Sequence, residues 1–110
     1  MENSDKGRLL PGLSALWAEF LPMLIRQVEV IEAGALALRE GNLPDELRSR
    51  AKAEAHKLAG SIGSFGSDEG SRLARQIEQM LGAAGPIDAE QAQQLTDLAA
   101  QLRRELEALH

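Results

Sequence analysis

The stretch AEAHKLAGSIGSFGSDEGSRLARQIE, residues 53–78, decides the fold of this chain. Its two halves carry apolar residues at helical spacing, and the run Phe65-Gly66-Ser67 lies between them. We expect one helix to end near Phe65 and Gly66, and Ser67 to cap a second helix whose first turn holds two acids. The stretch therefore predicts two helices joined by a short turn. The first of these helices contains the interior histidine of the chain, His56.

A long amphipathic segment, residues 13–38, precedes this hairpin. Pro22 lies inside the segment and removes one backbone hydrogen bond, so we expect a kink, or a break into a short N-terminal cap helix and a longer helix. Gly41 and Asn42 then end the segment. Pro44, which is followed by two acids, predicts the start of the helix that carries the histidine.

A last amphipathic segment follows the hairpin. The run GAAGP, residues 82–86, ends the preceding helix, and Asp88 with Gln91 forms the pattern of a capping box for the next one. The composition is rich in Ala, Leu, Glu, Gln and Arg and contains no tyrosine, which favours helix throughout. The predicted fold class is all-α, an antiparallel up-down four-helix bundle.

A chain of 110 residues suffices for one domain with a modest core, so we expect a single helical bundle domain over residues 1–110, with residues 1–8 frayed. The apolar stripe of each segment predicts its buried face. The stripes consist of Leu13, Leu16, Trp17, Phe20, Leu24, Val28, Ile31, Ala35 and Leu38, of Leu73, Ile77, Met80 and Leu81, and of Ala92, Leu95, Leu98 or Ala99, Leu102, Leu106 and Leu109. We also interpret Met23, like Trp17 and Phe20, as a packing residue.

Composition and charge narrow the possible classes of function. The chain has no cysteine, which excludes disulfides, thiolate metal sites and cysteine nucleophiles. A net charge of -5, with acids interleaved among the bases, argues against nucleic-acid binding. No apolar run reaches the ~20 residues that cross a bilayer, and the N-terminus lacks a secretory signal. We therefore expect a cytoplasmic protein that binds other proteins and neither nucleic acid nor membrane.

The position of His56 on its helix is unusual. At about 100° per residue, an apolar arc roughly 80° wide faces the core. His56 lies about 180° from Leu47 of this arc, and Lys52, Gly60 and Gly63 lie within about 40° of the histidine. The arc consists of Leu47, Ala51, Ala55, Leu58, Ile62 and Phe65. We therefore expect the imidazole to be exposed to water.

Two glycines on a solvent-facing helix surface need an explanation, because each lowers the stability of the helix by roughly 1 kcal/mol relative to alanine. With no side chain at Gly60 or Gly63, and only methyl groups at Ala53 and Ala59, a partner protein could approach the imidazole closely. Lys52 adds positive charge one turn away. This face is therefore suited to presenting a histidine to a bulky, anionic active site.

An exposed imidazole is neutral in a large fraction of molecules at cellular pH, and one ring nitrogen then holds a lone pair that can attack phosphorus. The resulting phosphohistidine has a high-energy P–N bond, so the phosphoryl group can move onward, for instance to an aspartate. No glycine-rich phosphate loop, cluster of metal-binding acids or base–nucleophile pair accompanies His56. The chain is therefore expected to be a phosphoryl carrier, not an enzyme, with catalysis supplied by another protein.

The block AHKLAGSIGSFG, residues 55–66, followed by LARQIE, residues 73–78, resembles the signature of the histidine phosphotransfer (HPt) domain family. The resemblance covers about residues 45–80. It implies a four-helix bundle that relays phosphoryl groups in two-component signalling, taking them from a receiver-domain aspartate or a sensor kinase and passing them to another receiver. By this resemblance His56 is the phosphoacceptor, and Gly60 is the small residue that admits the receiver.

The chain departs from the family pattern near the histidine. The family often has a lysine three positions after it, which helps to hold the phosphoryl oxygens, and here that residue is Ala59. Lys52 lies on the same face of the helix as the histidine, whereas Lys57 points about 100° away. Lys52 is therefore the better candidate for this charge.

Two alternatives to a free-standing carrier stay open. The chain could be a non-catalytic helical adaptor that docks a partner through the same small-residue face, or the phosphoacceptor domain of a larger kinase or regulator. We expect a monomer or part of a larger multidomain protein, with no cofactor and no metal site, since any Mg²⁺ would belong to the receiver. Either ring nitrogen of the histidine could accept the phosphoryl group.

Overall fold

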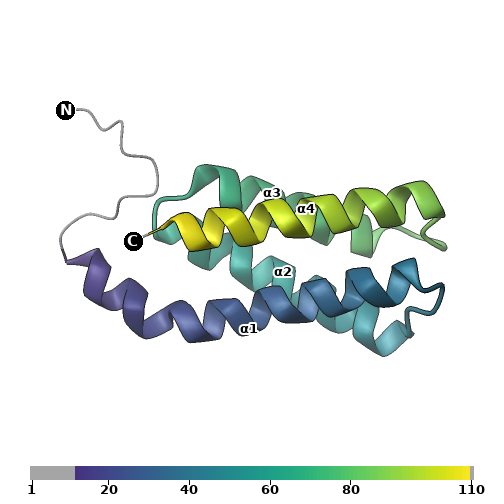
Figure 1. Cartoon of the computed structure of the whole chain (residues 1–110), viewed down its shortest axis with the longest axis horizontal. Coiled ribbons are helices and arrows are strands. Elements are labelled where there is room, and N and C mark those ends of the chain that lie inside the picture. Colours follow the sequence, from purple (N-terminus) through teal and green to yellow (C-terminus); the bar gives the residue numbers. More distant parts are fainter. Residues whose placement is uncertain (1–11, 110) are drawn as a thin grey trace.

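The computed structural model describes residues 12–109. This part of the chain forms four helices, α1 (Leu13–Arg39), α2 (Asp45–Ser64), α3 (Asp68–Gly82) and α4 (Ala89–Ala108). Short loops join consecutive helices, which run antiparallel, and α1 packs against α2 and α4 while α3 packs against the same two helices from the other side (Figure 1). The prediction of an all-α, up-down four-helix bundle is confirmed. Residues 1–11 and 110, which include the segment expected to be frayed, lie outside the described residues.

Helix α1 is continuous through Pro22. The expected break into a short cap helix and a longer helix is therefore wrong. Pro22 is exposed, while Trp17 and Leu24 on either side of it are 3% and 0% exposed. An interior proline costs about 3 kcal/mol, and burying one large apolar side chain contributes about 1.5–3 kcal/mol. The shared burial of these two side chains in one core therefore offsets the penalty and keeps both halves in a single helix.

The turn between α2 and α3 has the predicted form. Gly66 adopts a φ of 104°, in the left-handed region that favours glycine. The hydroxyl of Ser67 accepts a hydrogen bond of 2.9 Å from the backbone N–H of Gly70 and so caps α3. A Cβ atom at Gly70 would lie 2.6 Å from Cδ1 of Ile62, so the first turn of α3 can approach α2 only because this residue is glycine. The capping box of Asp88 and Gln91 at the start of α4 is confirmed as well.

The α2–α3 hairpin has a simple register that positions the site described below. Three pairs of residues that lie opposite each other across the hairpin are equidistant in sequence from Ser67. The pairs are Gly63 with Ser71, His56 with Glu78, and Lys52 with Gly82. Because both helices rise by the same 1.5 Å per residue, the turn fixes which residue of α3 lies opposite each residue of α2.

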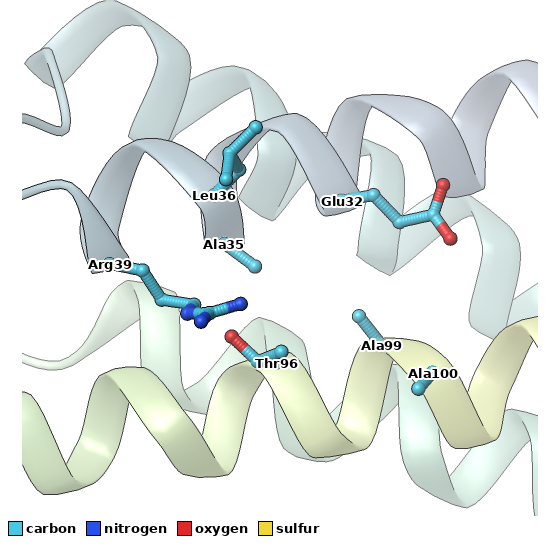
Figure 2. A pocket seen from close by; sticks show the side chains of 7 residues that line it. All are labelled: Glu32, Ala35, Leu36, Arg39, Thr96, Ala99 and Ala100. Carbon is cyan, nitrogen blue, oxygen red and sulfur yellow. The ribbon is translucent and has the colours of Figure 1, made fainter.

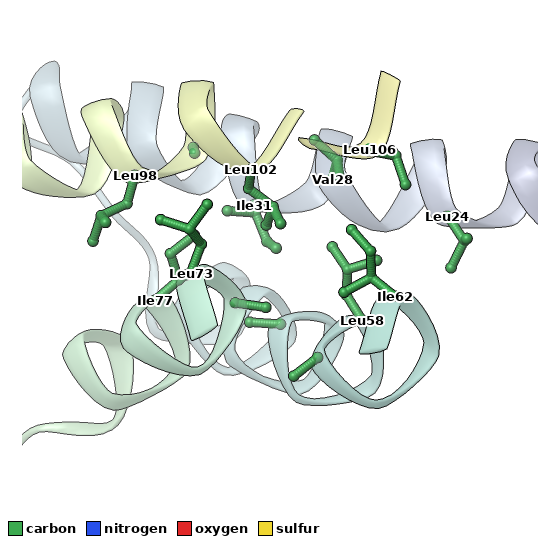
Figure 3. Close-up of a cluster of buried hydrophobic side chains, with 14 of the residues drawn as sticks. Leu24, Val28, Ile31, Leu58, Ile62, Leu73, Ile77, Leu98, Leu102 and Leu106 are labelled. Carbon is green, nitrogen blue, oxygen red and sulfur yellow. The ribbon is translucent and has the colours of Figure 1, made fainter. Parts of the chain in front are cut away.

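The core lies along the axis of the bundle, where large aliphatic side chains of all four helices point toward one another (Figure 3). Those less than 2% exposed include Leu24, Val28, Ile31, Leu58, Ile62, Leu73, Ile77, Leu95, Leu102 and Leu106. The predicted arc of α2 is buried except for Leu47, which is half-buried. In the other stripes Leu13, Leu38 and Met80 are half-buried, and Leu16 and Phe20 are exposed.

Polar contacts join the helices outside the core. The Arg48 side chain of α2 donates hydrogen bonds to three backbone carbonyls at the end of α3, those of Leu81, Ala83 and Gly85, over 2.7–2.9 Å. Arg103 of α4 donates two hydrogen bonds, of 2.7 and 2.8 Å, to the carboxylate of Glu32 in α1. These hydrogen bonds are the main reason why the pKa of Arg103 is raised. Within residues 12–109, no helix combines the length and the apolar character needed to cross a membrane.

Candidate functional site

His56 lies on the outer surface of α2, where its side chain is 74% exposed. The predicted exposure of the imidazole is thus confirmed. Its Nδ1 atom lies 2.9 Å from Oε2 of Glu78, which belongs to α3. One edge of the ring is therefore held against the neighbouring helix, and the remainder is open to a partner.

The contact with Glu78 defines the state of the ring. An ionised carboxylate can only accept hydrogen bonds, so in this contact Nδ1 carries the hydrogen. In the neutral ring the lone pair then resides on Nε2, the atom that makes no contact with Glu78. The Glu78 side chain is 27% exposed, so the hydrogen bond is only partly open to competition from water. The arrangement thus leaves the lone pair of Nε2 free of any contact with Glu78.

No role for Glu78 was predicted from the sequence. Its position inside the block at residues 73–78 was visible, but helical periodicity on α3 alone says nothing about α2. The signal that would identify it is the register of the hairpin, because His56 and Glu78 are equidistant from Ser67. Given the turn, an antiparallel pairing places these two residues opposite each other.

The histidine borders an open hollow of about 470 Å³ on the outer surface of α2 and α3. Its lining residues are Ser49, Lys52, Ala53, His56, Lys57 and Glu78. Both lysines predicted to support a phosphoryl group are therefore beside the imidazole. A small anionic group attached to the ring would lie in a hollow that is lined by two lysines and by Glu78.

The two lysines differ in their present contacts. The Lys57 ammonium lies 3.5 Å from Oε2 of Glu54, which belongs to the same helix. Lys52 extends across to the end of α3, where a Cβ atom at Gly82 would lie 3.0 Å from its Cε and 3.3 Å from its Nζ. Among residues 12–109, no ion pair of Lys52 is found. Lys52 can therefore contact a new anion without breaking an ion pair within this part of the chain.

The small residues beside the histidine do not all lie on the open face. Gly60 is exposed, and a Cβ atom there would have nothing within 4 Å. Gly63 is half-buried, and its Cβ would lie 3.3 Å from Oγ of Ser71, so this glycine mainly allows α3 to pack closely. The interpretation that the methyl group of Ala59 belongs to the open face is wrong. Ala59 is 5% exposed because α3 covers it, and its carbonyl accepts a 2.9 Å hydrogen bond from the Ser71 hydroxyl.

An exposed apolar patch lies next to this face. It consists of Leu16, Phe20 and Met23, which are 42%, 39% and 37% exposed. They border a hollow of about 370 Å³ that includes Ser64 of α2 and the ring of Phe65. The packing predicted for the aromatic residues holds for both, since the ring centroids of Trp17 and Phe20 lie 4.8 and 6.2 Å from that of Phe65, although Phe20 and Met23 stay partly accessible.

The patch and the bare part of α2 are contiguous. Ser64 lies one turn after Gly60, and its hydroxyl donates a 3.0 Å hydrogen bond to the Gly60 carbonyl. The surface therefore passes from His56 over Gly60 to the apolar side chains of α1 without a bulky residue of α2 in between. It offers a partner an exposed imidazole, room for close approach and an apolar contact.

Comparison with known proteins agrees with this geometry. The family model of the Hpt domain matches residues 15–110. Protein RcaC of Microchaete diplosiphon is 26% identical over 105 residues, which cover 96% of this chain but only 16% of the relative. No solved structure gives a significant match. Because the family match extends over nearly the whole chain, the chain belongs to the Hpt domain family, whose members are phosphotransfer modules of two-component signalling.

Proposed function

We propose that this chain carries a phosphoryl group on Nε2 of His56, which it receives from a receiver-domain aspartate or a sensor kinase and passes to another receiver. The observation that carries this proposal is the state of the imidazole, which is 74% exposed and held at Nδ1 by Glu78. No other histidine lies within residues 12–109. Nε2 is therefore the ring nitrogen that we propose to be phosphorylated, a choice that the sequence left open.

The transfer step follows from this geometry. The lone pair on Nε2 attacks the phosphorus of an aspartyl phosphate, the N–P bond forms, and the bond from phosphorus to the aspartyl oxygen breaks. The aspartate leaves as a carboxylate, and the ring becomes a phosphoimidazolium that keeps its hydrogen on Nδ1. The carboxylate of Glu78 faces the positive charge that develops and stabilises it. The reverse step regenerates the neutral ring.

Lys52 is proposed to contact the transferred phosphoryl group. Its ammonium borders the same hollow as His56, and its side chain can leave Gly82 without breaking an ion pair among the described residues. Lys57 is the weaker candidate, because its ammonium already lies 3.5 Å from the carboxylate of Glu54. Lys52 would thus supply the positive charge that other family members place at the position of Ala59.

Gly60 and the apolar patch of Leu16, Phe20 and Met23 are proposed as the docking surface for the receiver. An exposed apolar group beside a reactive residue is typical of a protein interaction site. Gly60 leaves space for the partner's backbone, while Gly63 and Ala59 contribute only indirectly by letting α3 pack close to α2. The partner would bring the catalytic groups and any Mg²⁺, so this chain would not be an enzyme in its own right.

The test is incubation of the chain with a phosphorylated receiver domain or its kinase. We expect label that is labile in acid and stable in base on the wild-type chain, and none on His56→Gln. The alternative function, a non-catalytic adaptor, predicts that neither chain takes up label and that His56→Gln still binds the receiver and functions. Label on a serine, or label that survives acid, would overturn the proposal.

A further inference from the structure

Arg75 differs from the other arginine of α3 in its contacts. Its side chain is exposed, and within residues 12–109 it forms neither a hydrogen bond nor an ion pair. Arg72, three residues earlier, donates hydrogen bonds to Glu69 and Gln76. The guanidinium of Arg75 can therefore turn toward a new anion without giving up a contact in this part of the chain.

The acids of α3 do not neutralise Arg75. They are Asp68, Glu69 and Glu78. Glu69 forms an ion pair with Arg72, and Glu78 contacts the imidazole on α2. Asp68 lies seven residues before Arg75, which is about two turns along the helix. The positive charge of Arg75 thus remains available on the outer surface of the hairpin.

The register of the hairpin places Arg75 near the histidine. Arg75 and Ala59 are equidistant from Ser67, so they lie opposite each other in the same way as His56 and its partner on α3. The two levels are three residues apart, which is about 4.5 Å along the helix axis. Lys52 precedes His56 by four residues, about 6 Å along the axis in the other direction. Two cations therefore flank the level of the imidazole from opposite ends.

The surface between Arg75 and the imidazole is open. At the level of Arg75, α2 presents Ala59, which is 5% exposed, and Gly60, where a Cβ atom would have nothing within 4 Å. The axes of packed helices lie about 8–10 Å apart, and an extended arginine side chain spans most of such a gap. Arg75 does not line the hollow beside His56, so a contact requires its guanidinium to turn toward the ring.

We propose that Arg75 binds the phosphoryl group on Nε2 of His56, from the side opposite Lys52. This inference rests on the proposed phosphotransfer and assigns Arg75 the stabilisation of its product. A guanidinium can donate two parallel hydrogen bonds to two phosphoryl oxygens, whereas an ammonium group acts as a point charge. Arg75 forms and breaks no covalent bond in this step. Its charge offsets the repulsion between the phosphoryl group and the carboxylate of Glu78.

The proposed contact has a consequence for the equilibrium of transfer. Because Arg75 stabilises the phosphohistidine, Arg75→Gln should shift the equilibrium with a phosphorylated receiver toward the aspartyl phosphate. The expected shift is about twofold to fivefold, which is the effect of one exposed ion pair. The affinity for the unphosphorylated receiver should stay unchanged.

The decisive test uses phosphoramidate, a small phosphoryl donor that needs no receiver. Nε2 of His56 attacks its phosphorus, the new N–P bond forms, the P–N bond of the donor breaks, and ammonia leaves. Phosphorus-31 NMR then follows the phosphoryl signal, identified by its absence in His56→Gln, as the pH is changed. A nearby cation favours the dianion, so Arg75→Gln should raise the pKa of the phosphoryl group by about 0.2–0.7 of a unit. Arg75→Lys should lie between this variant and the wild type.

Arg39 provides a control that is matched in charge. It is also exposed, but it borders a groove of about 250 Å³ between α1 and α4, on the side of the bundle away from the hairpin (Figure 2). Arg39→Gln removes the same charge and should move the pKa of the phosphoryl group by no more than about 0.1 of a unit, because the solvent screens distant charges.

The outcomes separate this inference from the proposed function. If phosphohistidine forms in both chains and titrates alike in the wild type and Arg75→Gln, the role of Arg75 is overturned and the proposed function stands. If His56 of the wild type takes up no phosphoryl group, both are overturned. A loss of receiver affinity in Arg75→Gln with an unchanged phosphoryl pKa would assign Arg75 to docking, and would also overturn the inference.

Discussion

Oε2 of Glu78 lies 2.9 Å from Nδ1 of His56, across the hairpin of α2 and α3. This relationship converts an exposed histidine, which could react at either nitrogen, into one with a defined tautomer. It also places a negative charge where the phosphorylated ring carries a positive one. The contact is therefore relevant both to the ground state and to the product of the proposed reaction.

Removal of the carboxylate should slow phosphoryl transfer. We expect Glu78→Ala to lower the rate by about tenfold or more, because the ring loses both its fixed tautomer and its compensating charge. Glu78→Gln should fall between this variant and the wild type, since its amide oxygen can still accept from Nδ1–H. Nitrogen-15 spectra of the imidazole would report the tautomer in each variant. Phosphorylation of the wild-type ring on Nδ1 would contradict the assignment.

Gly60 and Gly63 form a matched pair for separating stability from docking. Gly60→Ala should raise the free energy of unfolding by up to about 1 kcal/mol, because the new methyl group meets nothing within 4 Å. Gly63→Ala should gain less, since its methyl group would press on the Ser71 side chain at 3.3 Å. Urea unfolding of the two variants measures this difference.

A large residue at Gly60 tests docking alone. Gly60→Leu should remain folded and should lose most of its affinity for the receiver, because its side chain occupies the space through which the partner approaches His56. The measurement is titration of a labelled receiver domain, with His56→Gln as a variant that keeps the surface and loses the acceptor. Normal receiver binding by Gly60→Leu would remove this glycine from the docking surface.

The two lysines of the hollow should not be equivalent. Lys52→Gln is expected to slow transfer by about threefold to tenfold, which is the effect of losing one partly screened charge beside the phosphoryl group. Lys57→Gln should have little effect, because that ammonium is already paired with Glu54. Rapid-quench measurement of transfer from a phosphorylated receiver compares them. Equal effects of both substitutions would mean that a diffuse positive field, and not Lys52 itself, assists the reaction.

We expect Arg48 to stabilise the folded state and to have no part in phosphoryl transfer. Its three hydrogen bonds reach the carbonyls at the end of α3, where a positive charge also interacts favourably with the helix dipole. Since the group is partly exposed, Arg48→Met should lower the free energy of unfolding by about 1.5–3 kcal/mol. The exposed Arg50→Met on the same helix is the control and should lie within about 0.5 kcal/mol of the wild type. Urea unfolding of both variants measures these changes in the free energy of unfolding.

Local signals in the sequence predicted the elements that depend on a few neighbouring residues. The Gly66-Ser67 turn, the capping box of Asp88 and Gln91 and the exposure of His56 follow from backbone conformation, capping and the helical period. These local signals did not predict that α1 continues through Pro22 without a break. It depends on burial of Trp17 and Leu24 in a core formed by other helices.

The errors at the site have a similar origin. A helical wheel treats α2 as an isolated cylinder with one buried arc, but α3 covers a second strip of its surface, and Ala59 lies in that strip. The partner of the histidine was missed because Glu78 belongs to a different helix. Likewise, the apolar spacing of Phe20 and Met23 predicts a face of α1, and only the positions of the other helices decide whether that face is covered.

The register of the hairpin about Ser67 links the length of a distant loop to the chemistry of the ring. If one extra residue in the turn were accommodated as a one-residue shift of register, α3 would move relative to α2 by about 1.5 Å along its axis and about 100° around it, which would carry the carboxylate away from the imidazole. Insertions and deletions that most surface loops tolerate should therefore be selected against here. If His56 carries the phosphoryl group as proposed, the spacing between these two helices sets which of its ring nitrogens reacts.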